Sequence, residues 1–212
     1  MITPEAVYQR VRTVLPDARV ELVNNPGPSG QHALLVDRGD LVKVAQLLKT
    51  DSSLLLDFAS NVSGVDWPVK KVKEIVVRKE TVEGVEKEVK ETVEKETGGY
   101  LEVVYHLYSI TQKTGPIVMR VRTGDRDADV VVPSVVSIWK SADFQEREIY
   151  DLFGIRFEGH PDLRRLLMWD EFVDHPMRKD YVAPDDYEYE PTPHDKILEK
   201  VKARNLSGGA SE

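Results

Sequence analysis

The chain has 212 residues, of which 41% are apolar and 31% charged, and its formal net charge is −8. That length allows a buried core without disulfide or metal cross-links, and the negative charge argues against nucleic-acid binding, which needs a basic surface. Because cysteine is absent, the chain cannot form disulfides, hold an iron–sulfur cluster in the usual way or use a thiol nucleophile.

Neither the N-terminus nor any apolar window predicts a membrane segment. The N-terminus carries charges throughout and does not resemble a signal peptide. The most apolar window, VVVPSVVSI at 130–138, is far shorter than the roughly 20 residues that span a bilayer. We therefore expect any membrane association to go through a partner or the protein surface.

The first third of the chain alternates helical and strand patterns. Apolar residues recur at helical spacing in three segments and alternate with polar residues in two, and the latter predict strands. In chain order we expect a helix from Pro4 to Pro16, strands over 18–24 and 31–37, and helices over 40–48 and 54–62. Thr3 and Asp40 are the expected N-caps of the first two helices.

The next segment, 69–97, consists almost entirely of Val, Lys, Glu and Thr with balanced charges. Its later valines suit one stripe of a helix, whereas valine and threonine favour strands and Glu83-Gly84 could turn a long hairpin. The composition leaves both alternatives open. In either form the segment has too little apolar surface for a core, and we expect a solvated protrusion inserted at a loop.

Alternating patterns then predict a sheet. Strands are expected over 100–110 and 117–123, joined by a hairpin turn at 112–116, with a short third strand over 129–134. Together with the N-terminal part they predict an α+β fold, in which a mixed or antiparallel β-sheet carries the N-terminal helices on one face.

Residues 141–182 combine many charges with glycines and prolines at non-repeating positions, a pattern typical of specific turns. We expect Ser141 to cap a helix that Gly154 ends in the left-handed conformation, and Pro161 to begin a second, short helix. This gives a helix-turn-helix segment after an α+β domain at 1–140. The tail, 183–212, is expected to be extended and partly disordered.

Cofactor and catalytic motifs are missing. Neither G-x-G-x-x-G nor G-x-x-x-x-G-K-[ST] occurs, and the five histidines are scattered. The best acid–histidine cluster for a metal or an enzyme site comprises Glu146, Glu148, Asp151 and His160. The competing interpretation is structural: Arg147 and Arg156 pair with these acids, and His160 caps the second helix.

What remains is recognition, because acids and arginines alternate around aromatic and aliphatic anchors, as in a buried interface. The same residues could instead hold the segment's own helices together. The predicted partner interface comprises Glu146, Arg147, Glu148, Asp151, Gly154, Phe157, Gly159, His160, Pro161, Arg164, Arg165, Arg178 and Lys179.

Two stretches of this segment resemble a known family. EREIYDLFGIRFEGHPDLRRLL at 146–167 and HPMRKDY at 175–181 are similar to the signature of the C subunit, or 30 kDa subunit, of proton-pumping NADH–quinone oxidoreductase, respiratory complex I. The sequence VVYHLYSI and Gly64-Val65-Asp66 also resemble this family. The sequence departs from it at 69–97, usually a short connection, and at Phe144-Gln145, where tryptophan or tyrosine is typical.

The resemblance implies a non-catalytic α+β subunit of the peripheral arm, on the cytoplasmic side of the bacterial inner membrane. It implies no cofactor on this chain, with FMN and iron–sulfur clusters in partner subunits. The implied partners are the D and B subunits of complex I, which together form the quinone site. The alternatives are the equivalent subunit of a membrane-bound hydrogenase or of a quinone oxidoreductase with another donor, and a stand-alone enzyme using the acid–histidine cluster.

Overall fold

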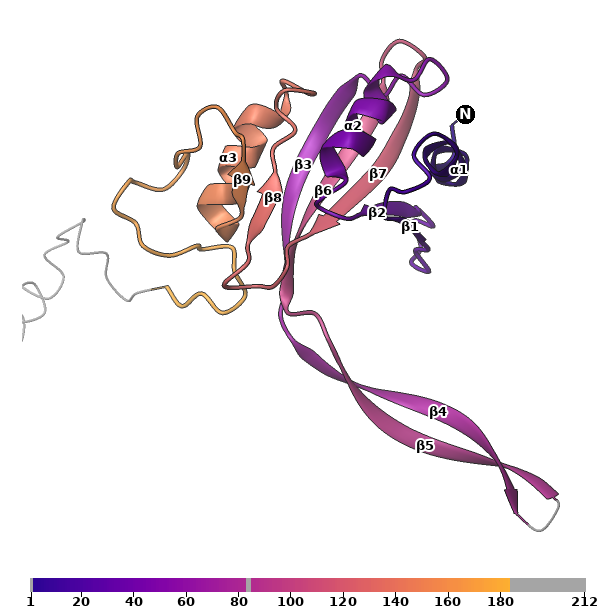
Figure 1. Ribbon diagram of the computed structural model, residues 1–212. Helices are drawn as coiled ribbons and strands as arrows, with labels where there is room; N and C mark the ends of the chain where they lie inside the picture. The colour runs from indigo at the N-terminus through magenta and orange to yellow at the C-terminus, as the bar shows by residue number, and fades with distance from the viewer. Residues whose placement is uncertain (1, 83–84, 184–212) are drawn as a thin grey trace, which may run out of the picture. The chain divides into compact units, whose positions relative to one another are not determined.

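The computed structural model describes residues 2–82 and 85–183, and the chain divides into two units, residues 1–181 and 182–212. Almost all described residues belong to the first unit, whose helices and strands are labelled in Figure 1. In chain order the elements are α1 (Pro4–Val14), β1 (Val20–Val23), β2 (Ala33–Val36), α2 (Leu41–Thr50), β3 (Phe58–Trp67), β4 (Lys70–Val82), β5 (Val85–Thr97), β6 (Tyr100–Ser109), β7 (Thr114–Arg122), β8 (Val131–Pro133), α3 (Ala142–Phe153) and β9 (Arg156–Glu158).

Five strands form the central sheet in the order β1-β2-β7-β6-β3. β2 and β7 run parallel, and the other neighbouring pairs of this sheet are antiparallel. Two further sheets of two strands each form from β4 with β5 and from β8 with β9. The prediction of a mixed sheet in an α+β fold is therefore confirmed.

The two N-terminal helices share one apolar core with the inner face of this sheet (Figure 1). α1 begins where predicted, because Thr3 Oγ1 accepts the backbone N–H of Ala6 at 3.3 Å. Val7 and Val11 of α1 and Leu48 of α2 are fully buried. From the sheet, alternate side chains of β6 and β7 complete the core: Leu101, Val103, Tyr105, Leu107, Ile117, Met119 and Val121. Burial of each such aliphatic side chain contributes roughly 1.5–3 kcal/mol.

The predicted helix over 54–62 is wrong, because these residues form a turn and then the start of β3. The Asp51 carboxylate accepts the backbone N–H of Ser53 at 2.8 Å and so holds a tight turn directly after α2. Leu55 follows with a φ of 42°, outside the right-handed helical region. By periodicity, a short apolar run fits a helix and a buried strand equally well. Here backbone pairing with β6 makes the run part of a strand.

α3 covers the free edge of β3, the last strand of the central sheet. Gln145 Oε1 accepts the backbone N–H of Val62 at 2.5 Å, and the Ser141 hydroxyl donates to the carbonyl oxygen of Ala59 at 2.8 Å. Ser141 precedes α3 as predicted, but its side chain makes no capping hydrogen bond. The side chains at the start of α3 thus satisfy backbone groups that an exposed sheet edge would leave unpaired.

Residues 69–97 contain the antiparallel pair of β4 and β5, of 13 residues each, so the strand alternative is the one that the chain adopts. The suggested turn at Glu83-Gly84 lies outside the described residues. Lys71 and Glu96 stand opposite each other in the register, with their charged groups 3.7 Å apart. Within the described ranges, β4 and β5 pair only with each other.

The predicted short helix beginning at Pro161 is wrong, because residues 159–181 form turns and bends instead. The expected helix-turn-helix therefore lacks its second helix. The first helix is as predicted, and Gly154 ends it with a φ of 80°. The second helix is absent because a carboxylate side chain of α3 accepts hydrogen bonds from backbone N–H groups of the following segment. The predicted extended tail lies, apart from Ala183, outside the described residues.

Candidate partner interface

Asp151, in the last turn of α3, is the centre of the polar network that replaces the predicted second helix. Its side chain is fully buried. Oδ2 accepts the backbone N–H groups of Leu166, Leu167 and Met168 at 3.0, 2.7 and 2.8 Å, and Oδ1 accepts from Arg165 Nη1 at 2.7 Å. Because each of these donors would be costly to leave unpaired near the core, the carboxylate fixes the path of the chain after β9.

Burial alone would raise the pKa of Asp151, but the hydrogen bonds from Met168 and Arg165 outweigh burial and hold this pKa below its ordinary value. The carboxylate is therefore ionised at neutral pH, and the largely buried guanidinium of Arg165 matches its charge. The sequence prediction assigns Asp151 and Arg165 to a partner interface, whereas the structure pairs them with each other inside the chain.

Two further arginines bind carbonyl oxygens around the end of α3. Arg147 donates to the carbonyl oxygens of Arg164 and Arg165, at 3.4 Å in each case. Arg178 Nε donates to the carbonyl oxygen of Phe153 at 2.8 Å. The last carbonyl groups of a helix have no partner within the helix, and Arg178 supplies such a donor at the end of α3. Arg147, which belongs to α3, binds carbonyl groups of the following segment and so anchors that segment to the helix.

Gly154 allows the segment to return closely to the end of α3. Besides its left-handed backbone, a Cβ at this position would lie 2.5 Å from His175 Nε2, so only glycine fits. His175 Nδ1 donates to the carbonyl oxygen of Asp151 at 2.9 Å. Burial lowers the pKa of His175, so the ring is neutral at pH 7 and acts as a structural donor.

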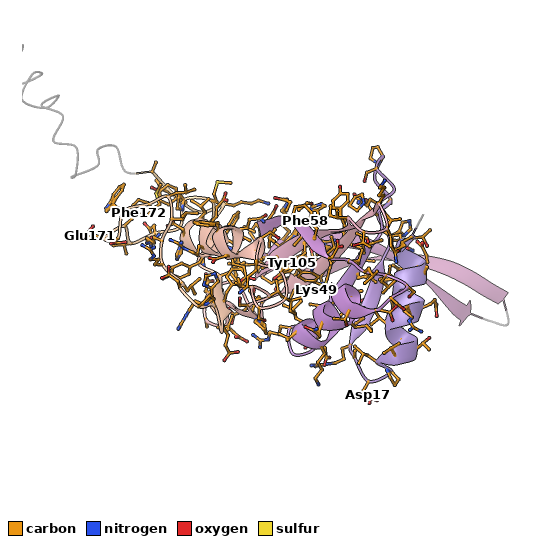
Figure 2. The ribbon with its side chains drawn as sticks, turned by 90° about the horizontal axis from the view of Figure 1, so that it is seen from above. Asp17, Lys49, Phe58, Tyr105, Glu171 and Phe172 are labelled. Carbon is orange, nitrogen blue, oxygen red and sulfur yellow. The ribbon has the colours of Figure 1, made fainter. Side chains whose placement is uncertain are left out.

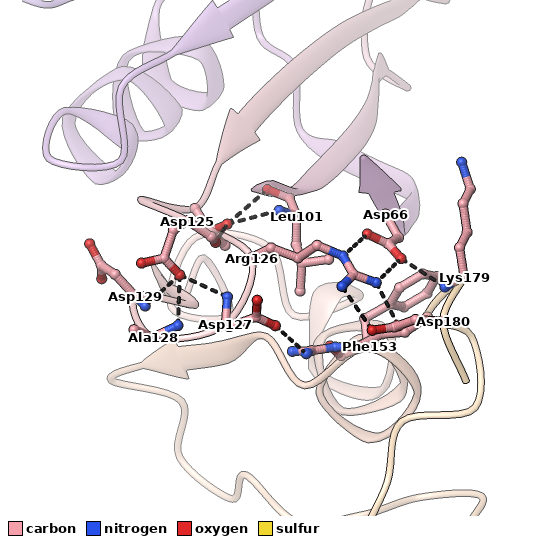
Figure 3. A network of polar contacts seen from close by, with 12 residues as sticks. Asp66, Leu101, Asp125, Arg126, Asp127, Ala128, Asp129, Phe153, Lys179 and Asp180 are labelled. Carbon is pink, nitrogen blue, oxygen red and sulfur yellow. Dashed lines mark hydrogen bonds and ion pairs between the residues drawn. The ribbon is translucent and has the colours of Figure 1, made fainter. Parts of the chain in front are cut away.

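A second network joins the end of the segment to the sheet and to the loop after β7 (Figure 3). Arg126 Nε and Nη2 donate to the two oxygens of Asp66 at 2.7 and 2.8 Å, and Nη1 and Nη2 donate to Asp180 at 2.9 and 2.6 Å. The backbone N–H of Lys179 also donates to Asp66, at 2.8 Å. The hydrogen bonds from Arg126 hold the pKa of Asp180 at about 2. Sequence reasoning missed Arg126, because a charged residue in a turn carries no periodic signal.

The four residues of the candidate acid–histidine cluster point to different partners. Glu146 is fully buried and accepts hydrogen bonds from the Ser134 hydroxyl at 2.6 Å and the Val135 N–H at 2.9 Å. His160 contacts the carbonyl oxygen of Asp143, whereas Glu148 is exposed. Burial raises the pKa of Glu146 to about 7. Over the described ranges no three His, Asp or Glu residues are arranged to hold a metal ion.

The remaining predicted interface residues divide by exposure. Phe157 is buried, whereas Gly159, Pro161, Arg164 and Lys179 are exposed. The segment also exposes several large apolar side chains, which we call the anchor residues: Phe144, Leu167, Trp169, Val173 and Met177. The exposed fractions reach 63% at Phe144 and 88% at Val173. Figure 2 shows Glu171 and Phe172, which lie between Trp169 and Val173 in the sequence, well apart from Asp17 and Lys49.

The anchor residues have the composition of a docking surface. Phe144 lies on α3, and the other four follow one another along the irregular segment at 159–181. Monomeric proteins expose single apolar residues widely, whereas exposed apolar residues that gather in one place are typical of an interaction site. The segment is also rigidly placed by Asp151 and the arginines, so the apolar side chains are presented without a large ordering cost on binding. Across the described residues, no helix combines the length and apolar character needed to cross a bilayer.

Comparison with known proteins identifies the family to which the chain is similar. Residues 34–187 match the family model described as "Respiratory-chain NADH dehydrogenase, 30 Kd subunit". The C subunit of NADH-quinone oxidoreductase from a Nocardioides species is 38% identical over 152 residues, which is 72% of this chain and 49% of that protein. The protein of the same name from Geobacter metallireducens is 35% identical over 152 residues, 72% of this chain and 75% of that protein. The match thus spans about half the length of the first relative.

Among solved structures, a chain of the membrane-bound sulfane sulfur reductase, an archaeal respiratory membrane complex, has the same fold. The TM-score is 0.55 and the identity 18%, over 92% of this chain and 91% of that chain. At this identity the likeness concerns the fold alone.

Proposed function

The chain belongs to the family of the 30 Kd subunit of respiratory-chain NADH dehydrogenase, and from this membership we propose that it is a non-catalytic scaffold subunit in the peripheral arm of a proton-pumping NADH–quinone oxidoreductase. The complete enzyme passes electrons from NADH through FMN and iron–sulfur centres to quinone. In this proposal those groups reside in partner subunits. The chain binds partners like the D and B subunits of that enzyme, on the cytoplasmic side of a bacterial inner membrane.

The anchor residues carry the proposal. They are exposed apolar side chains, most of them on a segment that Asp151 and Arg165 hold in place inside the chain. Of the acids that could suggest catalysis, Asp151 holds this segment in place, Glu146 binds Ser134 and Val135, and Glu148 is exposed. A scaffold needs a pre-formed apolar surface and needs no reactive group.

Substitution of two anchor residues tests the proposal. Leu167→Asp with Val173→Asp places carboxylates among the exposed apolar side chains, and truncation of a hot-spot residue at an interface costs about 2 kcal/mol or more. We expect recovery of partner subunits with an affinity-tagged chain to fall by roughly tenfold or more. The matched control is Val42→Asp on α2, where the side chain is 43% exposed, and recovery should be unchanged.

Partner recovery equal to that of the unsubstituted chain, with both carboxylates in place, would contradict this surface. Identification of the recovered chains also tests the alternative of a related complex with another electron donor, because its donor-side subunits would differ. Stoichiometric flavin or metal in the purified chain would contradict the non-catalytic role.

Arg164 and Arg165, which the sequence prediction groups together, have separate roles. Arg164 is exposed and pairs with Asp162 at 2.9 Å, whereas Arg165 is largely buried against Asp151. We expect Arg164→Ala to act on partner binding alone. Arg165→Ala removes the counter-ion of a buried carboxylate and should first lower the stability of the chain.

A further inference from the structure

The strands β4 and β5 form a two-stranded sheet, which we call the ribbon and which joins no other strand in the described part of the chain (Figure 1). The backbone N–H of Gly99 closes its base by donating to the carbonyl oxygen of Trp67 at 2.6 Å. Each strand of an isolated pair leaves one row of backbone N–H and C=O groups without a strand partner. Because two strands alone are only marginally stable in water, a third strand would stabilise the ribbon.

The two strands of the ribbon differ in charge. β4 has five basic and two acidic residues, a net charge of +3, whereas β5 has three basic and five acidic residues, a net charge of −2. The whole chain has a net charge of −8, so β4 is a basic strand in an acidic protein. An acidic segment would therefore be attracted to the edge of β4 and repelled by most of the remaining chain.

The sequence of β4 also favours pairing with a further strand. Its centre is the apolar run Ile75-Val76-Val77, and β-branched residues of this kind favour strands. Basic residues flank the run, among them Lys73 and Arg78. In β5, three polar residues separate each valine from the next, so that strand has no comparable run. A segment that matches β4 has an apolar centre with acidic residues on both sides.

We propose that the outer edge of β4 is a docking site for an extended segment of a partner protein, which adds to the ribbon as a third strand. The segment carries acidic residues on both sides of an apolar centre. Main-chain hydrogen bonds hold it, and its charges select β4 over β5. A second copy of β4 does not fit, because two strands of net charge +3 repel each other. The site depends neither on the anchor residues nor on the proposed function, because it requires only a protein partner.

An exchange of charges between register partners tests the site. Lys73 stands opposite Glu94 in the register, and Lys79 stands opposite Glu88. The variant with Lys73→Glu, Glu94→Lys, Lys79→Glu and Glu88→Lys keeps an acid opposite a base and leaves the net charge of the ribbon unchanged. It changes the net charge of β4 from +3 to −1 and that of β5 from −2 to +2. In complex purified through the full chain at low salt, we expect recovery of one partner to fall by about tenfold or more.

The opposite exchange is the matched control. Glu80→Lys with Lys87→Glu also exchanges register partners, but it raises the net charge of β4 to +5. Recovery of the same partner should then stay equal or rise. Unchanged recovery with the first exchange would overturn the acidic segment as the occupant, and so would losses of similar size with both exchanges.

A photo-crosslinker identifies the occupant. Benzoylphenylalanine in place of Val76, in the assembled complex, should crosslink to a partner peptide that has acidic residues on both sides of an apolar run. The same group in place of Val42 on α2, where the side chain is 43% exposed, should not crosslink. Crosslinks from Leu167 but none from Val76 would overturn this inference and leave the proposed function intact. Crosslinks from Val76 to nucleic acid, to lipid or to a second copy of this chain would also overturn it.

Discussion

Two parts of the molecule keep their structure by different means. The inner face of the sheet and the helices α1 and α2 are joined by apolar side chains, among them Leu48 and Leu101, both fully buried. The segment at 159–181 contains no helix or strand and is fastened by polar contacts to Asp151, Arg126 and their neighbours.

This difference has consequences for tolerance to substitution. An apolar core depends on volume and pattern, so a similar side chain keeps most of the stability. A network of buried hydrogen bonds depends on single atoms, because one carboxylate oxygen of Asp151 accepts hydrogen bonds from three backbone N–H groups. The proposed docking surface thus lies on the part of the molecule that is most sensitive to a change of a single atom.

The largest contrast should come from two substitutions that conserve shape. Asp151→Asn removes the charge that faces buried Arg165, and breaking a buried pair in this way costs roughly 3–5 kcal/mol of unfolding free energy. Leu48→Met in the apolar core should cost less than about 1.5 kcal/mol. Urea unfolding gives both values, and hydrogen exchange at Leu167 and Met168 reports release of the segment. A smaller loss of unfolding free energy for Asp151→Asn than for Leu48→Met would contradict the greater sensitivity of the polar part to single substitutions.

Glu146 sharpens the comparison, because it is a buried acid whose hydrogen-bond donors are neutral groups, Ser134 and the backbone of Val135. Burial raises its pKa to about 7 in the folded chain. The folded state therefore holds a proton that the unfolded state releases, so this group lowers stability as pH rises from about 4.5 to 7. From that shift the loss is on the order of 3 kcal/mol.

Glu146→Gln, which stays neutral, should isolate this contribution. The stability of the variant relative to the unsubstituted chain should rise between pH 4.5 and 7 and then stay constant. His175 acts in the opposite direction, because its lowered pKa makes the folded state gain stability as pH rises, but it is present in both proteins and cancels. Denaturant unfolding at several pH values provides the measurement, and a difference independent of pH would show that folding does not raise the pKa of Glu146.

Two glycines with the same backbone conformation separate strain from crowding. Gly154 and Gly159 both have a φ of 80°, but a Cβ at Gly154 would meet His175, whereas nothing lies within 4 Å of one at Gly159. Gly159→Ala should cost roughly 1 kcal/mol, for the left-handed backbone alone. Gly154→Ala adds the clash and should cost roughly 2–4 kcal/mol in total. Thermal unfolding compares the two, and equal losses would mean that His175 moves aside freely.

The same division explains what could be predicted from the sequence. Periodicity identified α1, α2 and the strands β6 and β7, because their structure follows from which face is buried. It failed at 54–62, where a turn held by Asp51 and pairing with β6 override an ambiguous apolar run.

Beyond α3, the sequence predicted local turns but not the contacts between residues that are distant in the sequence. Residue type and the glycine position indicated specific turns and the end of the helix at Gly154. The pattern could not reveal that Asp151 takes the N–H groups of Leu166 to Met168, since this contact depends on distance in space and not on spacing along the chain. For the same reason Arg126 and Asp66 were absent from the predicted site.

The smallest expected effect lies at the exposed end of the second network. Asp180 pairs with Arg126, but its side chain is 64% exposed, whereas that of Asp66 on the same guanidinium is 1% exposed. Asp180→Asn should therefore cost at most about 1 kcal/mol, and less at high salt, because water and ions screen an exposed pair. Asp66→Asn leaves Arg126 facing a buried neutral amide and should cost several times more. Unfolding at low and high salt tests this. A loss of unfolding free energy in Asp180→Asn that high salt does not reduce would show that the Asp180 ion pair behaves as a buried one.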